Sequence, residues 1–270
     1  MADVRLRYEE GTIRVEGDLP ADFPDATLTD TVEYDPRTET GRAPAFEYLA
    51  IRDALADLPL TVTDDVLDLP TLDLETTYQL REYQQEALDA WRANDDRGVV
   101  ELPTGSGKTV VAIAAIAALD TPTLVVVPTL DLLDQWHREL TREFDGPVGR
   151  LGGDSQRVEV LTVSTYDSAY LRADELGDRF GLAVFDEAHH LGGEGYRDIA
   201  RLLAAPARMG LTATFERPDG AHEVVTELLG PVVFRRSADE LAGDHLAPYD
   251  IKRIEVELTP EERETYEGNQ

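Results

Sequence analysis

The sequence predicts an α/β protein in which a small α+β domain precedes a larger domain, built on a mainly parallel sheet and a phosphate-binding loop. Three observations lead to this fold class. The string VVELPTGSGKT at 99–109 reads as a strand, a glycine turn and the start of a helix. Strand-like and helix-like segments alternate after it, which is typical of βαβ units. The first 72 residues form a compositionally separate segment that opens with a hairpin pattern.

The N-terminal 72 residues are predicted to form the small α+β domain. Residues 5–18 alternate apolar and polar side chains on either side of Glu10-Gly11, which indicates a β-hairpin. Residues 45–58 place apolar side chains at helical spacing, and 60–69 form a further β-like run. Because this segment contains no catalytic constellation, a binding or docking module is the default interpretation.

An amphipathic helix is predicted over residues 80–92, just before the glycine turn. Its apolar face consists of Tyr83, Ala87, Leu88 and Trp91. Arg81 and Gln84 fall on the other side, where a polar side chain usually contacts solvent. An amide presents a donor and an acceptor together, however, and so suits an adenine edge. Solvated surface and adenine recognition therefore both remain open for this pair.

The glycine turn is predicted to bind a polyphosphate. Its residues are Pro103, Thr104, Gly105, Ser106, Gly107, Lys108 and Thr109. The glycines let backbone N–H groups point inward without a Cβ in the way, and the helix over 110–119 adds its positive N-terminal end. Lys108 would reach the β- and γ-phosphates, and the Thr109 hydroxyl is placed to bind Mg²⁺. The generic pattern requires glycine six residues before the lysine, where this chain has Leu102. A turn that only caps a helix is the alternative.

Strands and helices alternate behind this loop. The β-branched run at 121–128 lacks alternation, as expected of a strand buried on both faces of a parallel sheet. The segment 130–144 carries an apolar stripe typical of an amphipathic helix. Residues 149–154 read as a glycine turn, and 158–166 as another strand. This order predicts a parallel sheet.

The second chemical string is LAVFDEAHH at 182–190, an apolar strand that ends in Asp186 and Glu187. Ligands bind at the carboxyl ends of strands in an open parallel sheet. One carboxylate can hold the Mg²⁺ that bridges phosphates, while the next orients and deprotonates the attacking water. An acidic turn is the alternative. His189 and His190 do not indicate zinc, because adjacent imidazoles are expected to diverge and the chain has no Cys.

The remaining segments extend the same pattern. A strand that starts at residue 207 ends in Thr212 and Thr214, whose hydroxyls could relay the state of the γ-phosphate outward. Residues 222–231 predict an amphipathic helix, and 251–258 a final strand. A last helix is expected to begin after Thr259.

Composition excludes several classes of protein. The 270 residues contain no apolar run of 18 and no apolar N-terminal segment, so we expect no membrane partner and interpret the protein as cytoplasmic. The absence of Cys leaves no disulfide framework, thiolate chemistry or zinc ribbon.

The net charge of −30 is spread along the chain. Residues 1–72 carry 17 acidic and 6 basic side chains, and 73–270 carry 38 and 19, with lysine only at 108 and 252. Such a surface is typical of a halophilic protein in a salty cytoplasm. At about 1 M salt the Debye length is roughly 3 Å, so this charge does not exclude DNA. Contacts would be local hydrogen bonds to phosphate.

Six strings in order resemble the first motor domain of a superfamily 2 helicase, and most closely the XPB family of DNA repair and transcription helicases in its archaeal form. They are LREYQ, LPTGSGKT, VVPTLDLLDQW, TVSTYDSAY, FDEAHH and GLTATFERPDG. The resemblance implies a damage-recognition-like domain at 1–72 and a RecA-like, ATP-binding motor domain at 73–250. It also implies that 251–270 begin the connection to a second motor domain.

The same resemblance implies roles for individual residues. Arg81 and Gln84 would recognise adenine, the loop ending at Lys108-Thr109 would bind phosphates and Mg²⁺, Asp186 would bind Mg²⁺ and Glu187 would act as catalytic base. The residues along the DNA backbone would be Pro128, Thr129, Gly152, Gly153 and Thr165. Thr212 and Thr214 would couple hydrolysis to movement.

One motif of the family departs from its pattern here. The family's Arg-Glu-Asp motif is used in strand separation, and the matching positions read Arg217-Pro218-Asp219, so its central acid is missing. Arg217 is still expected near DNA.

The resemblance implies an ATP-dependent helicase or translocase of DNA repair that acts on duplex and single-stranded DNA. A second RecA-like domain would supply arginine fingers, which contribute factors of about 10³ to 10⁵ in rate, and nothing in the chain matches it. We therefore expect a fragment, or half of a split motor, that binds ATP but hydrolyses it poorly and does not unwind DNA alone. A repair nuclease is a further expected partner. The alternatives are a nucleotide-gated DNA-binding module without motor activity and an RNA helicase of the same superfamily.

Overall fold

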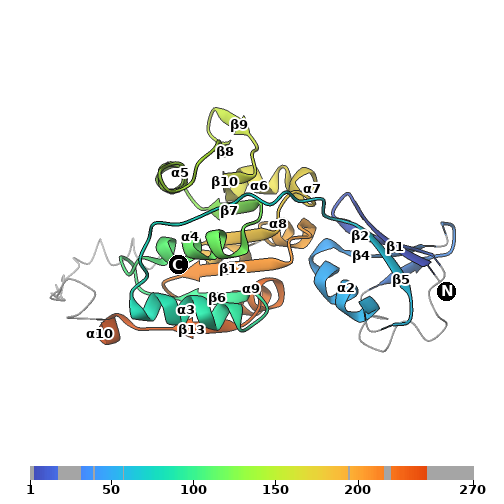
Figure 1. Cartoon of the computed structure of the whole chain (residues 1–270), viewed down its shortest axis with the longest axis horizontal. Coiled ribbons are helices and arrows are strands. Elements are labelled where there is room, and N and C mark those ends of the chain that lie inside the picture. Colours follow the sequence, from blue (N-terminus) through green and yellow to red (C-terminus); the bar gives the residue numbers. More distant parts are fainter. Residues whose placement is uncertain are drawn as a thin grey trace, which may run out of the picture.

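The computed structural model describes residues 3–17, 32–38, 40–56, 58–193, 195–215 and 220–241. Within them the chain forms a five-stranded sheet near its N-terminus and an eight-stranded sheet after it (Figure 1). The predicted fold class is therefore confirmed. The strand expected at 251–258, the helix after Thr259 and the Arg217 motif lie outside the described residues.

The smaller unit is a mixed sheet covered by one helix. Its elements are β1 Asp3–Glu9, β2 Thr12–Gly17, β3 Glu33–Asp35, β4 Thr40–Pro44, η1 Ala45–Glu47, α2 Tyr48–Ala56 and β5 Thr61–Asp65. The predicted hairpin is present, since β1 pairs antiparallel with β2 around Gly11, which has φ +81°. The strand order is β3-β4-β2-β1-β5, with β5 parallel to β1. Alternate residues of β1 and β2 point to one face and form a core with Ile51 and Leu55 of α2.

The larger sheet is parallel throughout except at one edge. Its strands are β6 Arg97–Glu101, β7 Thr123–Val127, β8 Val148–Gly152, β9 Ser155–Arg157, β10 Leu161–Thr165, β11 Leu182–Asp186, β12 Ala207–Thr212 and β13 Val232–Arg235. They lie in the order β13-β6-β12-β11-β7-β10-β8-β9, and the antiparallel pair is β8 with β9.

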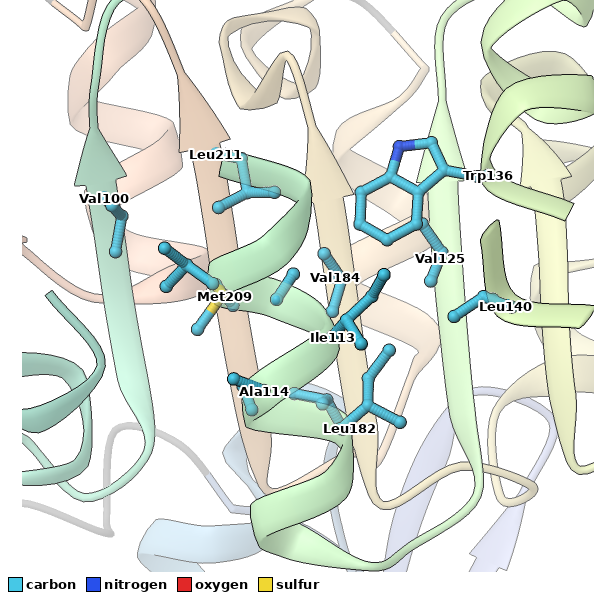
Figure 2. Close-up of a cluster of buried hydrophobic side chains, with 14 of the residues drawn as sticks. Val100, Ile113, Ala114, Val125, Trp136, Leu140, Leu182, Val184, Met209 and Leu211 are labelled. Carbon is cyan, nitrogen blue, oxygen red and sulfur yellow. The ribbon is translucent and has the colours of Figure 1, made fainter. Parts of the chain in front are cut away.

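Helices cover both faces of this sheet. One face carries α3 Glu82–Arg92, α4 Lys108–Leu119 and α5 Leu130–Glu143. The other carries α6 Tyr166–Tyr170, α7 Ala173–Leu176, η2 Ala188–Gly192, α8 Arg197–Leu202 and α9 Ala221–Leu229, and α10 Ala238–Leu241 ends the described chain. Each central strand sends alternate side chains into the two cores, so that Val125 faces α4 while Val126 faces the opposite layer. Figure 2 shows Ile113 of α4 over Val184 of β11 and Val125 of β7.

The two units pack against each other. The segment 66–81 crosses from β5 to α3 along the larger unit (Figure 1), where the Leu74 N–H donates to Asp120 Oδ1 at 2.7 Å. The Tyr8 hydroxyl donates to the Asp174 carbonyl at 2.9 Å. Ala204, which follows α8, is buried in the core of the smaller unit.

The structure corrects three details of the prediction. Residues 148–152 are strand β8, and only the tip at 153–154 turns, because Gly149 lies so close to β10 that a Cβ would come within 2.5 Å of Thr162 Oγ1. Strand β10 begins at Leu161, later than expected. The strands β3, β4, β9 and β13 were not predicted. Among the described residues, no helix combines the length and the apolar character that crossing a membrane requires.

Candidate functional site

The parallel sheet brings the predicted site residues to one edge. The loop 102–107 follows β6, Thr212 ends β12, and Asp186 ends β11. These three strands are neighbours in the sheet. The next three are β7, β10 and β8, and they end at the residues predicted to lie along DNA. Because the carboxyl ends of parallel strands share an edge, the two predicted sets occupy adjoining halves of it.

The glycine loop has the backbone that a phosphate cradle needs. Gly105 has φ +80° and Gly107 has φ +86°, a region that side chains other than glycine rarely adopt. Thr104 and Gly105 are exposed, while Ser106 is buried and its hydroxyl donates to the Pro103 carbonyl at 2.7 Å. Backbone N–H groups in such a turn, next to the start of α4, bind anions.

Lys108 and Thr109 are the first two residues of helix α4, directly after this loop. The Lys108 ammonium donates to the Leu102 carbonyl at 3.0 Å. Burial lowers the pKa of Lys108, and the charges of Glu187 and Asp186 act in the opposite direction. The ammonium and both carboxylates therefore act on one another across the site. The ammonium of Lys108 would attract a phosphate bound in this loop. The loop, Lys108 and Thr109 together fit a nucleotide polyphosphate.

Asp186 is buried, with 7 % of its surface exposed, and both of its carboxylate oxygens accept hydrogen bonds. The Trp136 indole N–H donates to Oδ2 at 2.8 Å, and the Glu187 backbone N–H donates to Oδ1 at 3.0 Å. Burial raises the pKa of Asp186, the hydrogen bond from Trp136 opposes this rise, and the charge of Glu187 adds to it. A second acid placed next to Asp186 suits a divalent cation, and hard oxygen ligands are those that Mg²⁺ takes.

Glu187 has a left-handed backbone, with φ +50° and ψ +53°. It begins the turn η2, and its Oε2 lies 3.5 Å from His189 Nδ1. That same nitrogen lies 3.3 Å from the Thr212 hydroxyl. The Thr212 hydroxyl in turn donates to the Thr214 carbonyl at 2.9 Å and accepts from the Thr214 N–H. The structure therefore connects Glu187 to the end of β12 through one imidazole.

The two histidines do not diverge as expected. The ring centroids of His189 and His190 are 4.4 Å apart, with an interplanar angle of 32°. The reason is local: residues 188–192 form one turn of 3₁₀ helix, in which His190 also packs against Tyr166.

Gln84 is not a solvated residue, so that interpretation is wrong for it. It is buried at 4 % exposure, its Oε1 accepts from the Arg81 N–H, and its Nε2 donates to the carbonyls of Ser106 at 3.0 Å and Gly107 at 3.3 Å. The buried stripe of α3 is wider than the predicted apolar face, because the amide replaces an apolar contact with bonds to the loop. The Tyr83 hydroxyl also donates to the Ser106 carbonyl. Arg81 is exposed at the N-terminus of α3.

The second half of the edge is built from helix caps and glycines. Thr129 caps α5 by accepting from the Leu132 N–H at 3.3 Å, and Thr165 caps α6 by accepting from the Ser168 N–H at 3.2 Å. A Cβ on Gly152 would come within 3.1 Å of the Thr165 methyl group. Pro128 precedes Thr129, and Gly153 turns the chain with φ +59°. Arg217 lies outside the described residues.

Sequence reasoning missed Trp136 and Glu101 as members of the site. The apolar stripe predicted over 130–144 gives Trp136 only a place in the core, although a buried indole N–H needs an acceptor. Glu101 ends β6, lies 2.6 Å from the Arg235 side chain and accepts from the Phe215 N–H at 3.3 Å. Glu101 thus joins the strand before the loop to the segment after Thr214.

Comparisons with protein families match both units. Residues 77–217 match the family model described as "Type III restriction enzyme, res subunit". Residues 6–66 match the model of the "Xeroderma pigmentosum group B helicase damage recognition domain".

Curated relatives match over most of this chain. The "DNA 3'-5' translocase XPB2" of Sulfurisphaera tokodaii is 42% identical, and the match covers 98% of this chain and 58% of that protein. The "Putative DNA 3'-5' helicase Rad25" of Haloarcula marismortui is 35% identical over 68% of this chain and 30% of that protein. The chain thus spans less than two thirds of the length of either relative.

A solved structure shares the fold. The UvsW helicase from bacteriophage T4 aligns with 86% of this chain and 99% of its own, with a TM-score of 0.51 and 14% identity. A likeness at this identity shows the arrangement of elements alone.

Proposed function

Because the chain belongs to the XPB family of superfamily 2 helicases, we propose that it binds ATP-Mg and duplex DNA as part of an ATP-dependent DNA helicase or translocase of repair. One observation carries this proposal. The sheet order places the residues proposed for ATP over β6, β12 and β11, and those proposed for DNA over the adjoining β7, β10 and β8. A nucleotide and a DNA backbone on these two halves would meet along the pair β11 and β7.

In this proposal the loop 103–107 and the start of α4 bind the phosphates through backbone N–H groups and Lys108. Thr109 and Asp186 would hold Mg²⁺, which would supply positive charge beside the phosphates. Glu187 would act as the base that orients and deprotonates the attacking water. Its neighbour His189 links it to Thr212, so Thr212 and Thr214 are proposed to couple hydrolysis to movement.

We propose that Arg81 and Gln84 contact adenine. The Gln84 amide already holds the glycine loop through Ser106 and Gly107. An adenine edge would therefore compete with these bonds. Binding of the base would then change how Gln84 holds the phosphate loop.

We propose that DNA runs along Pro128, Thr129, Gly152, Gly153 and Thr165, with Arg217 nearby. Glycines leave backbone N–H groups accessible to phosphate, and threonine hydroxyls can donate to it. The net charge of −30 opposes long-range attraction to DNA. We therefore propose a cytoplasm of high salt as the setting, in which this repulsion is screened.

The complete motor is proposed to need more than this chain. A second RecA-like domain would contribute arginine fingers worth about 10³ to 10⁵ in rate, so the chain alone is proposed to hydrolyse ATP weakly. We also propose that the domain boundaries lie near residues 72 and 250. A repair nuclease is proposed as a further partner.

Steady-state ATP hydrolysis in molar KCl with Mg²⁺ tests the function. It is measured with no nucleic acid, with duplex DNA and with duplex RNA, on wild type and Glu187→Gln. Turnover that DNA stimulates and Glu187→Gln abolishes supports a DNA-dependent ATPase. Nucleotide binding without turnover instead supports a nucleotide-gated DNA-binding module, and stimulation by RNA alone supports an RNA helicase. A chain that binds no ATP in Mg²⁺ refutes all three.

A further inference from the structure

Asp186 is held from two sides by buried aromatic side chains. The Trp136 indole N–H donates to its Oδ2 at 2.8 Å, and the Tyr166 hydroxyl donates to its backbone carbonyl at 3.2 Å. Trp136 is fully buried, and Tyr166 has 2 % of its surface exposed. Neither contact belongs to the glycine loop or to the helix that follows it.

Both aromatic residues come from helices whose N-caps are proposed DNA residues. Trp136 lies on α5, whose cap is Thr129, and Tyr166 is the first residue of α6, whose cap is Thr165. Figure 2 shows the Trp136 ring near the arrowhead ends of the strands, above Val125. Thr129 and Trp136 are about two helical turns apart, roughly 10 Å along the axis of α5.

We propose that Trp136 is a positioning residue that fixes the Asp186 carboxylate and transmits the engagement of DNA at α5 to the magnesium ligand. The Glu187 N–H occupies Oδ1 and Trp136 occupies Oδ2, so these two donors together define the plane of the carboxylate. A small displacement of α5 on a DNA backbone moves the indole and turns this plane. Tyr166 makes the corresponding connection from α6 to the Asp186 peptide.

This inference rests on the proposed function, since it names a regulation of the same site. The alternative explanation is that Trp136 is a core residue whose buried N–H needs an acceptor. Trp91 provides the matched comparison. It is also fully buried, and its N–H donates to the Arg208 carbonyl at 2.9 Å, away from Asp186.

The test uses Trp136→Phe and Trp91→Phe, which both remove one buried indole donor and keep an aromatic ring. Tyr166→Phe, which removes only a hydroxyl, is the second variant, and Tyr196→Phe is its control because the Tyr196 hydroxyl donates to the Asp167 side chain of α6 at 2.6 Å rather than to Asp186. The dissociation constant of the fluorescent derivative mant-ATP is measured in Mg²⁺ and in EDTA, each with and without duplex DNA, in molar KCl. Urea unfolding of each variant is recorded alongside.

In Trp136→Phe, the ratio of the dissociation constant in EDTA to that in Mg²⁺ should fall about fivefold, the range expected for one hydrogen bond. The factor by which DNA changes mant-ATP affinity should move toward one in both Trp136→Phe and Tyr166→Phe. Trp91→Phe and Tyr196→Phe should keep the wild-type values of both ratios, even where they lower stability.

An unchanged magnesium ratio in Trp136→Phe, or an equal fall in Trp91→Phe, overturns the proposal and leaves Trp136 a core residue. A wild type that binds mant-ATP in Mg²⁺ without any effect of DNA also overturns it, while the ATP-binding function stands. A wild type that binds no mant-ATP refutes the proposed function itself.

Discussion

Arg208 offers the sharpest test of how α8 and α9 are held against the larger sheet. It lies on β12 and is fully buried, and its guanidinium donates to four backbone carbonyls. They belong to Ala200 at 2.8 Å, Leu203 at 2.6 Å, Ala205 at 3.1 Å and Leu228 at 3.1 Å. The carbonyls of Ala200, Leu203 and Leu228 lie at the C-terminal ends of α8 and α9, where a positive charge is also favoured by the helix dipole, and that of Ala205 lies in the loop after α8.

Arg208→Met removes the charge and all four bonds while it keeps an unbranched side chain of similar length. A buried acceptor left without its donor costs about 1–3 kcal/mol, so four of them predict a large loss. The wild-type protein, however, must dehydrate the guanidinium, which costs several kcal/mol and offsets part of that sum. We therefore expect the free energy of unfolding to fall by about 3–5 kcal/mol, the range found when one partner of a buried charged interaction is removed.

Urea unfolding in molar KCl, followed by far-ultraviolet circular dichroism, measures this difference. Arg201→Met is the control, because Arg201 on α8 pairs with Glu227 at 3.4 Å and both side chains are at least 40% exposed. An exposed pair is worth about 0–1 kcal/mol. A loss in Arg208→Met no larger than that in Arg201→Met would refute the view that Arg208 fastens these helix ends.

Three further predictions concern other parts of the described chain. Burial raises the pKa of Glu47 above its ordinary value of 4.5, against the charges of Arg97 and Arg208, so the ionised carboxylate destabilises the folded state. Glu47→Gln should then unfold at higher urea than wild type at pH 7, and the difference should close below about pH 4; a difference that is constant with pH contradicts this. Gly107→Ala should weaken mant-ATP binding because its Cβ would come within 2.5 Å of Gln84 Nε2. Gly146→Ala is the control, because Gly146 has φ +110° and no atom within 4 Å of an added Cβ, so this change should lower only the stability of the fold. Equal mant-ATP affinity in the two variants argues against a Gln84 contact that shapes the loop. Raising KCl from about 0.2 M to about 2 M should raise the urea midpoint, because it screens the repulsion of a chain with net charge −30, and an equal concentration of NaCl should do the same if screening is the cause.

Local periodicity allowed most of the elements to be predicted. The short, β-branched run of β7 is typical of a strand buried on both faces, and the apolar stripe of α5 is typical of an amphipathic helix. The glycine turn between β6 and α4 was equally well predicted as a conformation, because Gly105 and Gly107 supply the positive φ that it requires. Strand β8 was mistaken for a turn, because glycine in a strand reflects a close neighbour that only the tertiary fold supplies.

Side-chain partners could not be predicted in the same way. Gln84 has a polar side chain on a predicted helix, and nothing local indicates that the loop 22 residues later would receive it. Arg208 interrupts an apolar strand, and its four acceptors lie at the ends of two helices and in the loop after α8. The Trp136 and Asp186 contact joins positions 50 residues apart. Each depends on strand order, which periodicity does not contain.

Strand order also explains why the proposed coupling between DNA and nucleotide is located at the pair of strands β11 and β7. Along the chain, β7, β8 and β10 lie between β6 and β11, yet in the sheet β12 and β11 are inserted between β6 and β7. This insertion gathers the loop, Thr212 and Asp186 on one side and leaves the caps Thr129 and Thr165 on the other. The two sets adjoin only where β11 pairs with β7, with Phe185 opposite Val126. The Trp136 bond to Asp186 spans that pair of strands from the helix that follows β7, so a DNA backbone and a nucleotide bound as proposed would both act on the same carboxylate.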